Sequence, residues 1–370
     1  MWLRTLHADR LRNLKTVSIE LPPGLTLITG RNGQGKTSLL EAAYLVGTAH
    51  SFRTRRIDEI VGWEGGPLRA FGEASGRRGD VALGIVLDQG QRRLFVDGAE
   101  RDLEGFLGRL DLVALSGEVL RVLRDGPDGR RRFLDSGVAG LRPSFLRDLR
   151  DHRRALASRN ALLRRAVGGP TTARREMEVW EERLAVVAER IHRQRREYAI
   201  GLASRLGAAE RALFPDGGEV RLGYRPSPAR AGDEEACSFA AAYREELERG
   251  RRRDQALGFT ATGPHRDDVE ATLDGVDLRR FGSAGQVRAA MVALSAAKLA
   301  LLRDDRGDAP LFLMDDFDSD LDEGRARSLV EFLRDGGFQA LLATAKDGFV
   351  DRLGFPFPRI RMEGGLARAA

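Results

Sequence analysis

The sequence has 370 residues and a formal net charge of +6, which leaves room for two or three domains with a sizeable core. A single cysteine, Cys237, excludes an internal disulfide and suits the reducing cytoplasm. No apolar run approaches the roughly 18 residues that a membrane span needs, and the first residues lack a signal-peptide pattern, so we expect a cytoplasmic protein without a membrane partner.

The chain begins with strand patterns. Residues 3–20 read as two short strands around a turn at residues 12–15, and Val17 to Glu20 alternate between apolar and polar side chains. Residues 25–29, LTLIT, form a short apolar run that ends at Gly30, which predicts a buried strand. Residues 38–46 follow as an apolar helix pattern.

Between that strand and that helix lies a complete G-x-x-x-x-G-K-[ST] motif at residues 30–37. Glycines allow the backbone N–H groups to point inward at a triphosphate, and the following helix directs its positive end at the same place. Lys36 is expected to contact the β- and γ-phosphates of ATP, and the Thr37 hydroxyl to bind Mg²⁺. The predicted nucleotide-binding residues are Gly30, Arg31, Asn32, Gly33, Gln34, Gly35, Lys36, Thr37 and Ser38.

A basic loop and a β-rich segment come next. The loop at residues 51–56 carries Arg53, Arg55 and Arg56. Residues 68–97 alternate strand patterns with Gly-rich turns, which predicts an antiparallel meander beside the nucleotide-binding sheet. Residues 110–115 predict a further strand. We therefore place the first half of an ATPase head at residues 1–123.

Residues 124–253 are predicted to be an inserted helical arm. Gly126 and Pro127 break the chain, and Arg130, Arg131 and Arg132 open a new helix. Within residues 141–214, apolar residues recur at alternating spacings of three and four, and residues 168–170 (GGP) separate two helices. This pattern predicts an antiparallel, coiled-coil-like hairpin, with an ordinary pair of packed helices as the alternative. The expected seam consists of Met177, Trp180, Leu184, Val187, Ile191, Gln194 and Tyr198.

The arm also carries most of the excess positive charge. Residues 121–200 contain 20 Arg and no Lys against 11 Asp and Glu, an excess of nine. A segregated basic region is typical of proteins that bind nucleic-acid backbones, although a solvated helical arm has the same composition. Arg53, Arg55, Arg56, Arg130, Arg131 and Arg132 are the candidates for DNA contact.

Residues 254–370 are predicted to complete the ATPase head. Residues 311–316, LFLMDD, read as a buried strand ending in two carboxylates, with Asp315 at the Mg²⁺ ion and Asp316 orienting or deprotonating the attacking water. Lys36, Asp315 and Asp316 are thus the predicted catalytic residues, and Thr37 and Asp315 the metal ligands. Upstream, residues 283–286 (SAGQ) open a long apolar helix, where Ser283, Gly285 and Gln286 could bind a γ-phosphate. A plain Ser N-cap is the alternative for Ser283.

These motifs resemble those of the RecF family, bacterial recombination mediator ATPases related to ABC and SMC proteins. The resemblance rests on GRNGQGKTSLLEA (30–42), SFRT (51–54), GPDGRRRFLD (126–135), TGPHRDD (262–268), SAGQ (283–286) and LMDDFDSDLD (313–322), the last of which includes a D-loop-like segment. It departs from the family at Ala284, where Gln is more frequent, and at Gly117-Glu118, where a Pro-Glu pair is usual. The switch His of transporters is also missing, and Thr344 or Lys346 takes its place as a candidate phosphate sensor.

The resemblance implies an α/β fold: an ABC-type P-loop ATPase head, with a mixed sheet and an antiparallel β subdomain, interrupted by the helical arm. It implies an ATP- and Mg²⁺-dependent homodimer that binds duplex or gapped DNA in the nucleoid and hydrolyses ATP slowly under DNA stimulation. It further implies work with RecR and RecO in loading RecA at single-strand gaps during recombinational repair. The alternatives are another SMC-like repair ATPase, an ABC transporter subunit, or a structural protein with a vestigial ATP site.

Overall fold

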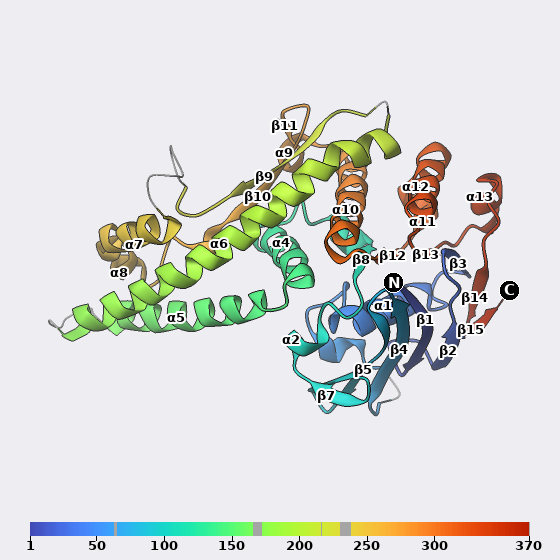
Figure 1. The fold of residues 1–370 in the computed structure, drawn as a ribbon, viewed down its shortest axis with the longest axis horizontal. Coiled ribbons are helices and arrows are strands. Elements are labelled where there is room, and N and C mark those ends of the chain that lie inside the picture. Colours follow the sequence, from blue (N-terminus) through green and yellow to red (C-terminus); the bar gives the residue numbers. More distant parts are fainter. Residues whose placement is uncertain (63–64, 166–171, 216, 230–237, 370) are drawn as a thin grey trace. The chain divides into compact units, whose positions relative to one another are not determined.

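The computed structural model describes residues 1–62, 65–165, 172–215, 217–229 and 238–369. The chain forms two compact units: unit 1 comprises Met1–Arg124, Leu202–Arg221 and Thr272–Ala370, and unit 2 comprises Asp125–Gly201 and Leu222–Ala271. Figure 1 shows the elements along the chain.

The central sheet of unit 1 carries the parallel strands of the fold. Its order is β15-β14-β3-β13-β12-β8, and all neighbours pair in parallel except β14 with β15. The parallel strands are short and almost wholly apolar, as expected for strands covered on both faces. The strands are β3 (Leu25–Thr29), β8 (Leu112–Leu115), β12 (Leu311–Met314), β13 (Ala340–Ala343), β14 (Arg359–Glu363) and β15 (Leu366–Ala369).

A second, antiparallel sheet has the order β2-β1-β4-β5-β6-β7. Alternation along β4 places one row of side chains in the core and the other in solvent. The meander predicted for residues 68–97 is confirmed in this sheet, and the unit is a mixed α/β fold as predicted. The strands are β1 (Trp2–Asp9), β2 (Thr16–Glu20), β4 (Leu68–Gly76), β5 (Gly79–Asp88), β6 (Gln91–Val96) and β7 (Ala99–Arg101).

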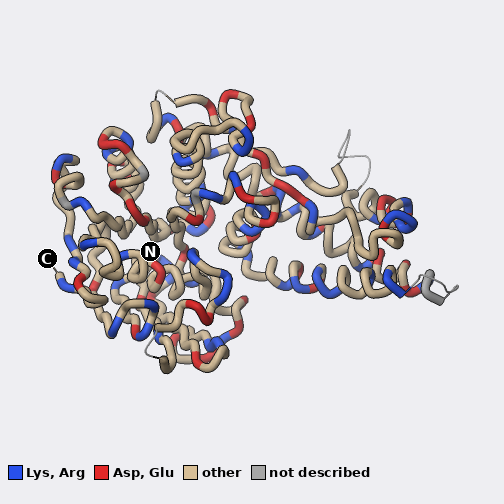
Figure 2. Tube along the Cα trace, turned by 180° about the vertical axis from the view of Figure 1, so that it is seen from behind, with Lys and Arg blue, Asp and Glu red and all other residues tan. Residues whose placement is uncertain are grey.

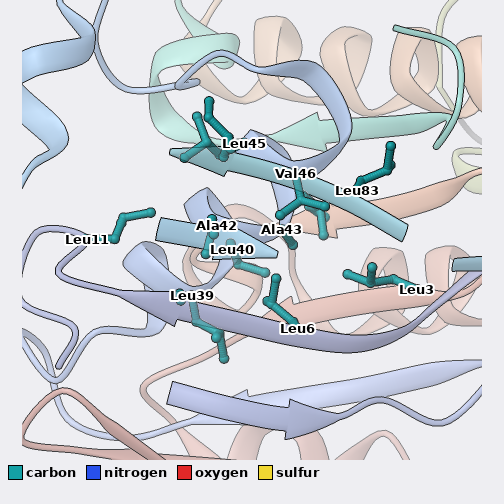
Figure 3. Packing of buried hydrophobic residues seen from close by; sticks show 14 of the residues in the cluster. Leu3, Leu6, Leu11, Leu39, Leu40, Ala42, Ala43, Leu45, Val46 and Leu83 are labelled. Carbon is teal, nitrogen blue, oxygen red and sulfur yellow. The ribbon is translucent and has the colours of Figure 1, made fainter. Parts of the chain in front are cut away.

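Helix α1 (Lys36–Thr48) fills the space between these two sheets. It is apolar on nearly every side because it is buried on nearly every side, and it shares one hydrophobic core with strands of both sheets. Figure 3 shows Leu40, Ala43 and Val46 of this helix beside Leu3 and Leu6 of β1. The core therefore fixes α1, and with it the start of α1, against the central sheet.

The remaining helices of unit 1 are mostly short. The longest, α10 (Ala284–Arg306), lies against β8, and of the described helices it alone has the length and hydropathy of a membrane span. Its apolar residues are largely buried in the core, as in a soluble protein's central helix. The other elements are η1 (Ile57–Ile60), α2 (Leu103–Phe106), α3 (Gly117–Leu120), α9 (Leu278–Phe281), α11 (Phe317–Asp320), α12 (Glu323–Asp335), α13 (Asp347–Arg352) and strand β11 (Val276–Asp277).

Unit 2 is built around α5 (Phe145–Arg165) and α6 (Thr172–Leu213), which lie side by side in Figure 1. Of the predicted seam, Met177, Leu184, Val187, Ile191 and Tyr198 are buried, and the polar member, Gln194, donates a hydrogen bond of 2.9 Å to Asp148 Oδ2 on α5. The predicted turn at residues 168–170 lies outside the described residues. The other elements are α4 (Pro127–Leu141), α7 (Phe239–Arg249), α8 (Arg251–Leu257), η2 (Pro264–Arg266), β9 (Val220–Arg225) and β10 (Asp268–Leu273).

Helix α6 differs from a coiled-coil strand because a second face is also buried. Ala185 and Ala188 pack against Phe239, Tyr243 and Leu247 of α7. Small residues on this face let α7 approach closely. The arm is therefore a compact lobe rather than a bare two-helix hairpin.

The boundaries of the units differ in part from those expected. The predicted break after residue 123 lies next to the observed one at Arg124, but unit 2 extends to Ala271 rather than to residue 253. Ion pairs explain the extension, because Asp267 and Asp268 bind Arg195 and Arg130 within unit 2. Helix α6 continues without a break to Leu213, and its C-terminal turns, from Leu202, belong to unit 1.

Candidate nucleotide-binding site

The P-loop connects the end of β3 to the start of α1, as predicted. Gly30 has φ +141°, and a Cβ there would lie 2.5 Å from the Met362 carbonyl oxygen. Gly35, the N-cap of α1, has φ +106°, and its Cβ would lie 2.9 Å from Leu14. Both glycines are therefore required by backbone conformation and by close packing.

Lys36 places a positive charge inside this loop. The side chain is 6% exposed, and its Nζ donates hydrogen bonds of 2.8 and 3.2 Å to the carbonyl oxygens of Gly30 and Arg31. A buried ammonium that is held by loop carbonyl oxygens at the start of a helix is well placed to bind the phosphates of a nucleotide. Arg31, Asn32 and Gly33 are exposed at the rim of the loop.

Two distant parts of the sequence meet at Thr37 and Asp315. Strand β13 lies between β3 and β12, so the loops that follow β3 and β12 emerge at the same edge of the sheet. There the Thr37 hydroxyl donates a hydrogen bond of 3.1 Å to Asp315 Oδ1. Burial raises the pKa of Asp315, and the hydrogen bond from Thr37 partly offsets that rise. These two oxygens fit a divalent cation, since a nearby positive charge would stabilise the buried carboxylate.

The described residues contain no cluster of three or more His, Cys, Asp and Glu that could hold a metal alone. A magnesium ion bound by Thr37 and Asp315 would therefore take its other ligands from phosphate oxygens and water, as Mg²⁺ commonly does at such sites. This donor set fits the predicted cofactor.

Asp316 directly follows Asp315 and has the left-handed conformation, with φ +50°. It is the N-cap of the short helix α11. A non-glycine residue in this conformation at the edge of a nucleotide site is typical of a strained functional position. At Asp316 the backbone therefore leaves the extended conformation of β12 and turns into α11.

Asp318 is a residue that sequence reasoning missed. It is 8% exposed, accepts a hydrogen bond of 2.7 Å from the Thr344 hydroxyl, and lies 3.5 Å from Lys346 Nζ. Both candidate phosphate sensors after β13 are thus held by one carboxylate from the segment after β12. The acidic run at residues 315–322 was the available signal, but it does not show which carboxylate turns inward.

The geometry of the SAGQ segment (residues 283–286) is compatible with a plain helix N-cap and also with contact to a γ-phosphate. Ser283 is the N-cap of α10, and it forms a capping box in which its hydroxyl accepts from the Gln286 N–H and Gln286 accepts from the Ser283 N–H. Ser283, Ala284, Gly285 and Gln286 are nevertheless all exposed. The segment is thus a rigid helix start whose outer surface is open to solvent.

The six arginines proposed for DNA contact fall into two groups. Arg130 is 3% exposed and makes a bidentate ion pair with Asp268, at 2.7 and 2.8 Å. Arg131 is 14% exposed and donates to the Asp267 carbonyl at 2.6 Å. The structure argues against DNA contact by these two, because internal partners bind their guanidinium groups. The exposed members are Arg53, Arg55, Arg56 and Arg132.

Arg53 and Arg56 have acidic neighbours but keep exposed surface. Arg53 lies 3.8 Å from Glu41 of α1, and Arg56 lies 3.8 Å from Glu59 and is 83% exposed. In unit 2, basic positions recur along α5, as Figure 2 shows. Both units therefore present positive charge on their surfaces.

Comparison with known proteins identifies the family. The AAA domain family matches residues 5–61, which include the P-loop and the basic loop. The DNA replication and repair protein RecF of Myxococcus xanthus is 37% identical over 355 residues, which cover 95% of this chain and 92% of that protein. The RecF of Halothermothrix orenii is 31% identical and covers 90% of this chain and 89% of that protein. The chain belongs to the RecF family.

Solved structures agree with this assignment. A structure of the recombination mediator protein RecF with ATP, from the RecFOR pathway, matches with a TM-score of 0.88 at 25% identity and covers 100% of this chain and 97% of that chain. An Smc head domain from Pyrococcus furiosus matches with a TM-score of 0.55 at 16% identity, over 100% of this chain and 96% of that chain, which shows the shared fold alone. The P-loop ATPase fold expected from the motifs is thereby confirmed.

Proposed function

We propose that this RecF-family protein is an ATP-dependent DNA-binding ATPase of recombinational repair, in which ATP joins two copies around duplex or gapped DNA. The hydrogen bond between Thr37 and Asp315 is the observation that carries the proposal, because it brings the P-loop and the acidic strand end together at one buried edge of the sheet. The solved RecF structure with ATP supports nucleotide binding by this chain.

In this proposal Lys36 exchanges its contacts with Gly30 and Arg31 for phosphate oxygens of ATP. Thr37 and Asp315 would hold Mg²⁺, and the bound ion would neutralise charge that develops on the phosphates. Asp316 orients the attacking water and accepts its proton. Aspartate reaches less far than the glutamate of transporter ATPases, so we expect slow hydrolysis.

The second copy contacts the nucleotide through the SAGQ segment. Its helix start directs a positive dipole end, the Ser283 hydroxyl and backbone N–H groups toward solvent-accessible space. The capping bond from the Gln286 N–H leaves the Ser283 hydroxyl hydrogen available as a donor to a γ-phosphate. ATP bound to one copy can therefore be shared with the other.

DNA binding is assigned to exposed arginines of each unit. Arg53, Arg55, Arg56 and Arg132 are the proposed contacts, and they would bind phosphates rather than read bases. Gripping of DNA by the ATP-bound dimer would make hydrolysis DNA-stimulated and would couple it to work with RecR and RecO in loading RecA at gaps. This role is carried over from the RecFOR pathway of the solved relative.

Single-turnover ATP hydrolysis, with and without gapped duplex DNA, tests the proposal. The wild-type chain should hydrolyse ATP slowly and faster with DNA, and Lys36→Arg should bind DNA without any response to ATP. Hydrolysis that DNA does not change, together with DNA affinity that ATP does not change, would leave only a vestigial nucleotide site.

A further inference from the structure

The P-loop is held from outside by two segments that lie far apart in the sequence. One is the turn at residues 12–15, between β1 and β2, and the other is the turn at residues 364–365, between β14 and β15. Both belong to unit 1, and β15 also lies against β2. We call the two turns together the P-loop clasp.

Asn13 is the first contact of the clasp. Its Nδ2 donates a hydrogen bond of 2.7 Å to the Gly33 carbonyl oxygen, and its Oδ1 accepts one of 2.7 Å from the Ser38 hydroxyl. One amide side chain thus connects the middle of the P-loop to the first turn of α1. Leu14, its neighbour, packs where a side chain on Gly35 would otherwise lie.

The turn between β14 and β15 supplies the second contact. The Gly364 N–H donates to Gln34 Oε1 at 2.5 Å, and the Gly365 N–H donates to the Gln34 carbonyl oxygen at 3.3 Å. The same turn closes onto the first one, because the Lys15 N–H donates to the Gly365 carbonyl oxygen at 3.2 Å. A Cβ on Gly365 would lie 2.2 Å from the Asn13 carbonyl oxygen, so only glycine fits there.

These contacts fix the direction in which two P-loop peptide groups point. In a trans peptide the carbonyl oxygen of one residue and the N–H of the next point in opposite directions. Because Gly365 binds the Gln34 carbonyl oxygen from outside, the Gly35 N–H points away from the clasp, into the loop. Asn13 holds the Gly33–Gln34 peptide in the same way, and the Gln34 N–H closes a turn onto the Arg31 carbonyl oxygen at 3.3 Å.

We infer that Asn13, Gln34 and the Gly364–Gly365 turn are positioning residues that orient the P-loop before ATP arrives. The inference rests on the proposed ATP site. A loop that is already oriented loses less conformational freedom when phosphate binds, so the clasp strengthens ATP binding. The Asn13 and Gln34 side chains are neutral amides: Asn13 binds the Gly33 carbonyl oxygen and the Ser38 hydroxyl, and Gln34 binds the Gly364 N–H. Substitution of Asn13 or Gln34 should therefore change the KM for ATP more than it changes kcat.

The test compares ATP affinity in Asn13→Ala, Gln34→Ala and the double variant with that of the wild-type chain, using calorimetry on the full-length protein. Loss of one hydrogen-bond set should raise the Kd for ATP about five- to tenfold in each single variant. The rise in KM should exceed any fall in kcat, and amides of the P-loop should exchange hydrogen faster without nucleotide. Arg368→Ala is the matched control, because Arg368 is exposed on the same hairpin in β15.

The outcomes separate the inference from the proposed function. A wild-type chain that fails to bind ATP would overturn the proposed function. Wild-type affinity in all three variants would overturn the clasp alone. A fall in kcat as large as the rise in KM, together with a lowered melting temperature, would also overturn it, because it would indicate general loss of structure.

Discussion

The stability of unit 2 should depend on a buried ion-pair network around Arg195. Arg195 on α6 is 3% exposed and binds Asp135 at 2.8 and 3.0 Å, Asp267 at 2.7 Å and the Pro264 carbonyl at 2.7 Å. Asp135 belongs to the RRRFLD segment and Asp267 to the HRDD segment, so Arg195 joins both family motifs. Asp267 is fully buried.

Replacing Arg195 by methionine keeps the packing volume but removes the charge. Asp135 is 20% exposed and can be hydrated. Among the residues that the structure describes, Asp267 would keep only the Tyr224 hydroxyl at 2.5 Å and the Ser227 N–H at 2.7 Å. An uncompensated buried charge costs about 3–5 kcal/mol. Most of that cost arises at Asp267, because burial already raises the pKa of this carboxyl and Arg195 is the main group opposing the rise.

The assay is chemical denaturation monitored by hydrogen exchange in α4 and in the part of α6 that ends at Gly201, because both belong to unit 2. Arg195→Met should lower the free energy of unfolding of this unit by about 3–5 kcal/mol. Arg193→Met, at an exposed position two residues away on the same helix, should stay within about 0.5 kcal/mol of wild type.

A double variant tests the cause of the loss. Adding Asp267→Asn to Arg195→Met removes the stranded carboxylate, so it should restore about 1–3 kcal/mol. The reasoning is refuted if Arg195→Met costs no more than Arg193→Met, or if Asp267→Asn makes the Arg195→Met chain less stable still.

Three further predictions concern acid stability, dimer formation and DNA affinity. Burial, aided by nearby positive charge, lowers the pKa of His152 to about 3 and that of His265 to about 4. Below pH 6.5 these histidines take up protons in the unfolded chain but not in the folded unit, so the free energy of unfolding of unit 2 should be highest above that pH and fall by up to about 1.4 kcal/mol per pH unit per histidine toward pH 4. Denaturation at several pH values measures this slope, and His152→Gln should reduce it. A free energy of unfolding that does not change with pH would contradict the assignment. Ser283→Arg should bind ATP with nearly wild-type affinity but form no ATP-dependent dimer by sedimentation, whereas a dimer of normal strength would exclude this segment from the interface. Anisotropy titrations should show that DNA affinity falls steeply with salt, and a salt-independent affinity would argue against phosphate contacts.

Much of the head was predictable because its signals are local. LTLIT followed by the glycine-rich motif predicted β3, the P-loop and α1, and LFLMDD predicted β12 with Asp315 at its end. The pairing of Thr37 with Asp315 followed from the chemistry of two known halves of one site. Periodicity also predicted the buried face of α6 that carries Met177, Leu184 and Ile191, but not its second buried face against α7.

The long-range contacts were not predictable because no local pattern encodes them. Arg159 lies in a polar stretch of α5 that suggests exposure, yet it is fully buried, bound to Glu181 on α6 and to Asp254 on α8. Arg130 looked like a surface cation for the same reason. The contact between Gln34 and Gly364 joins residues that are 330 positions apart, and glycine pairs at turns are too frequent to indicate it.

The central claim is that ATP joins two copies of this chain, and the mass of the particle in solution tests it most directly. Light scattering should give 40.8 kDa without nucleotide and twice that value with ATP and Mg²⁺, with Lys36→Arg remaining at the lower mass. A wild-type mass that stays at 40.8 kDa with saturating ATP and Mg²⁺, in the presence as well as the absence of gapped DNA, would contradict the account.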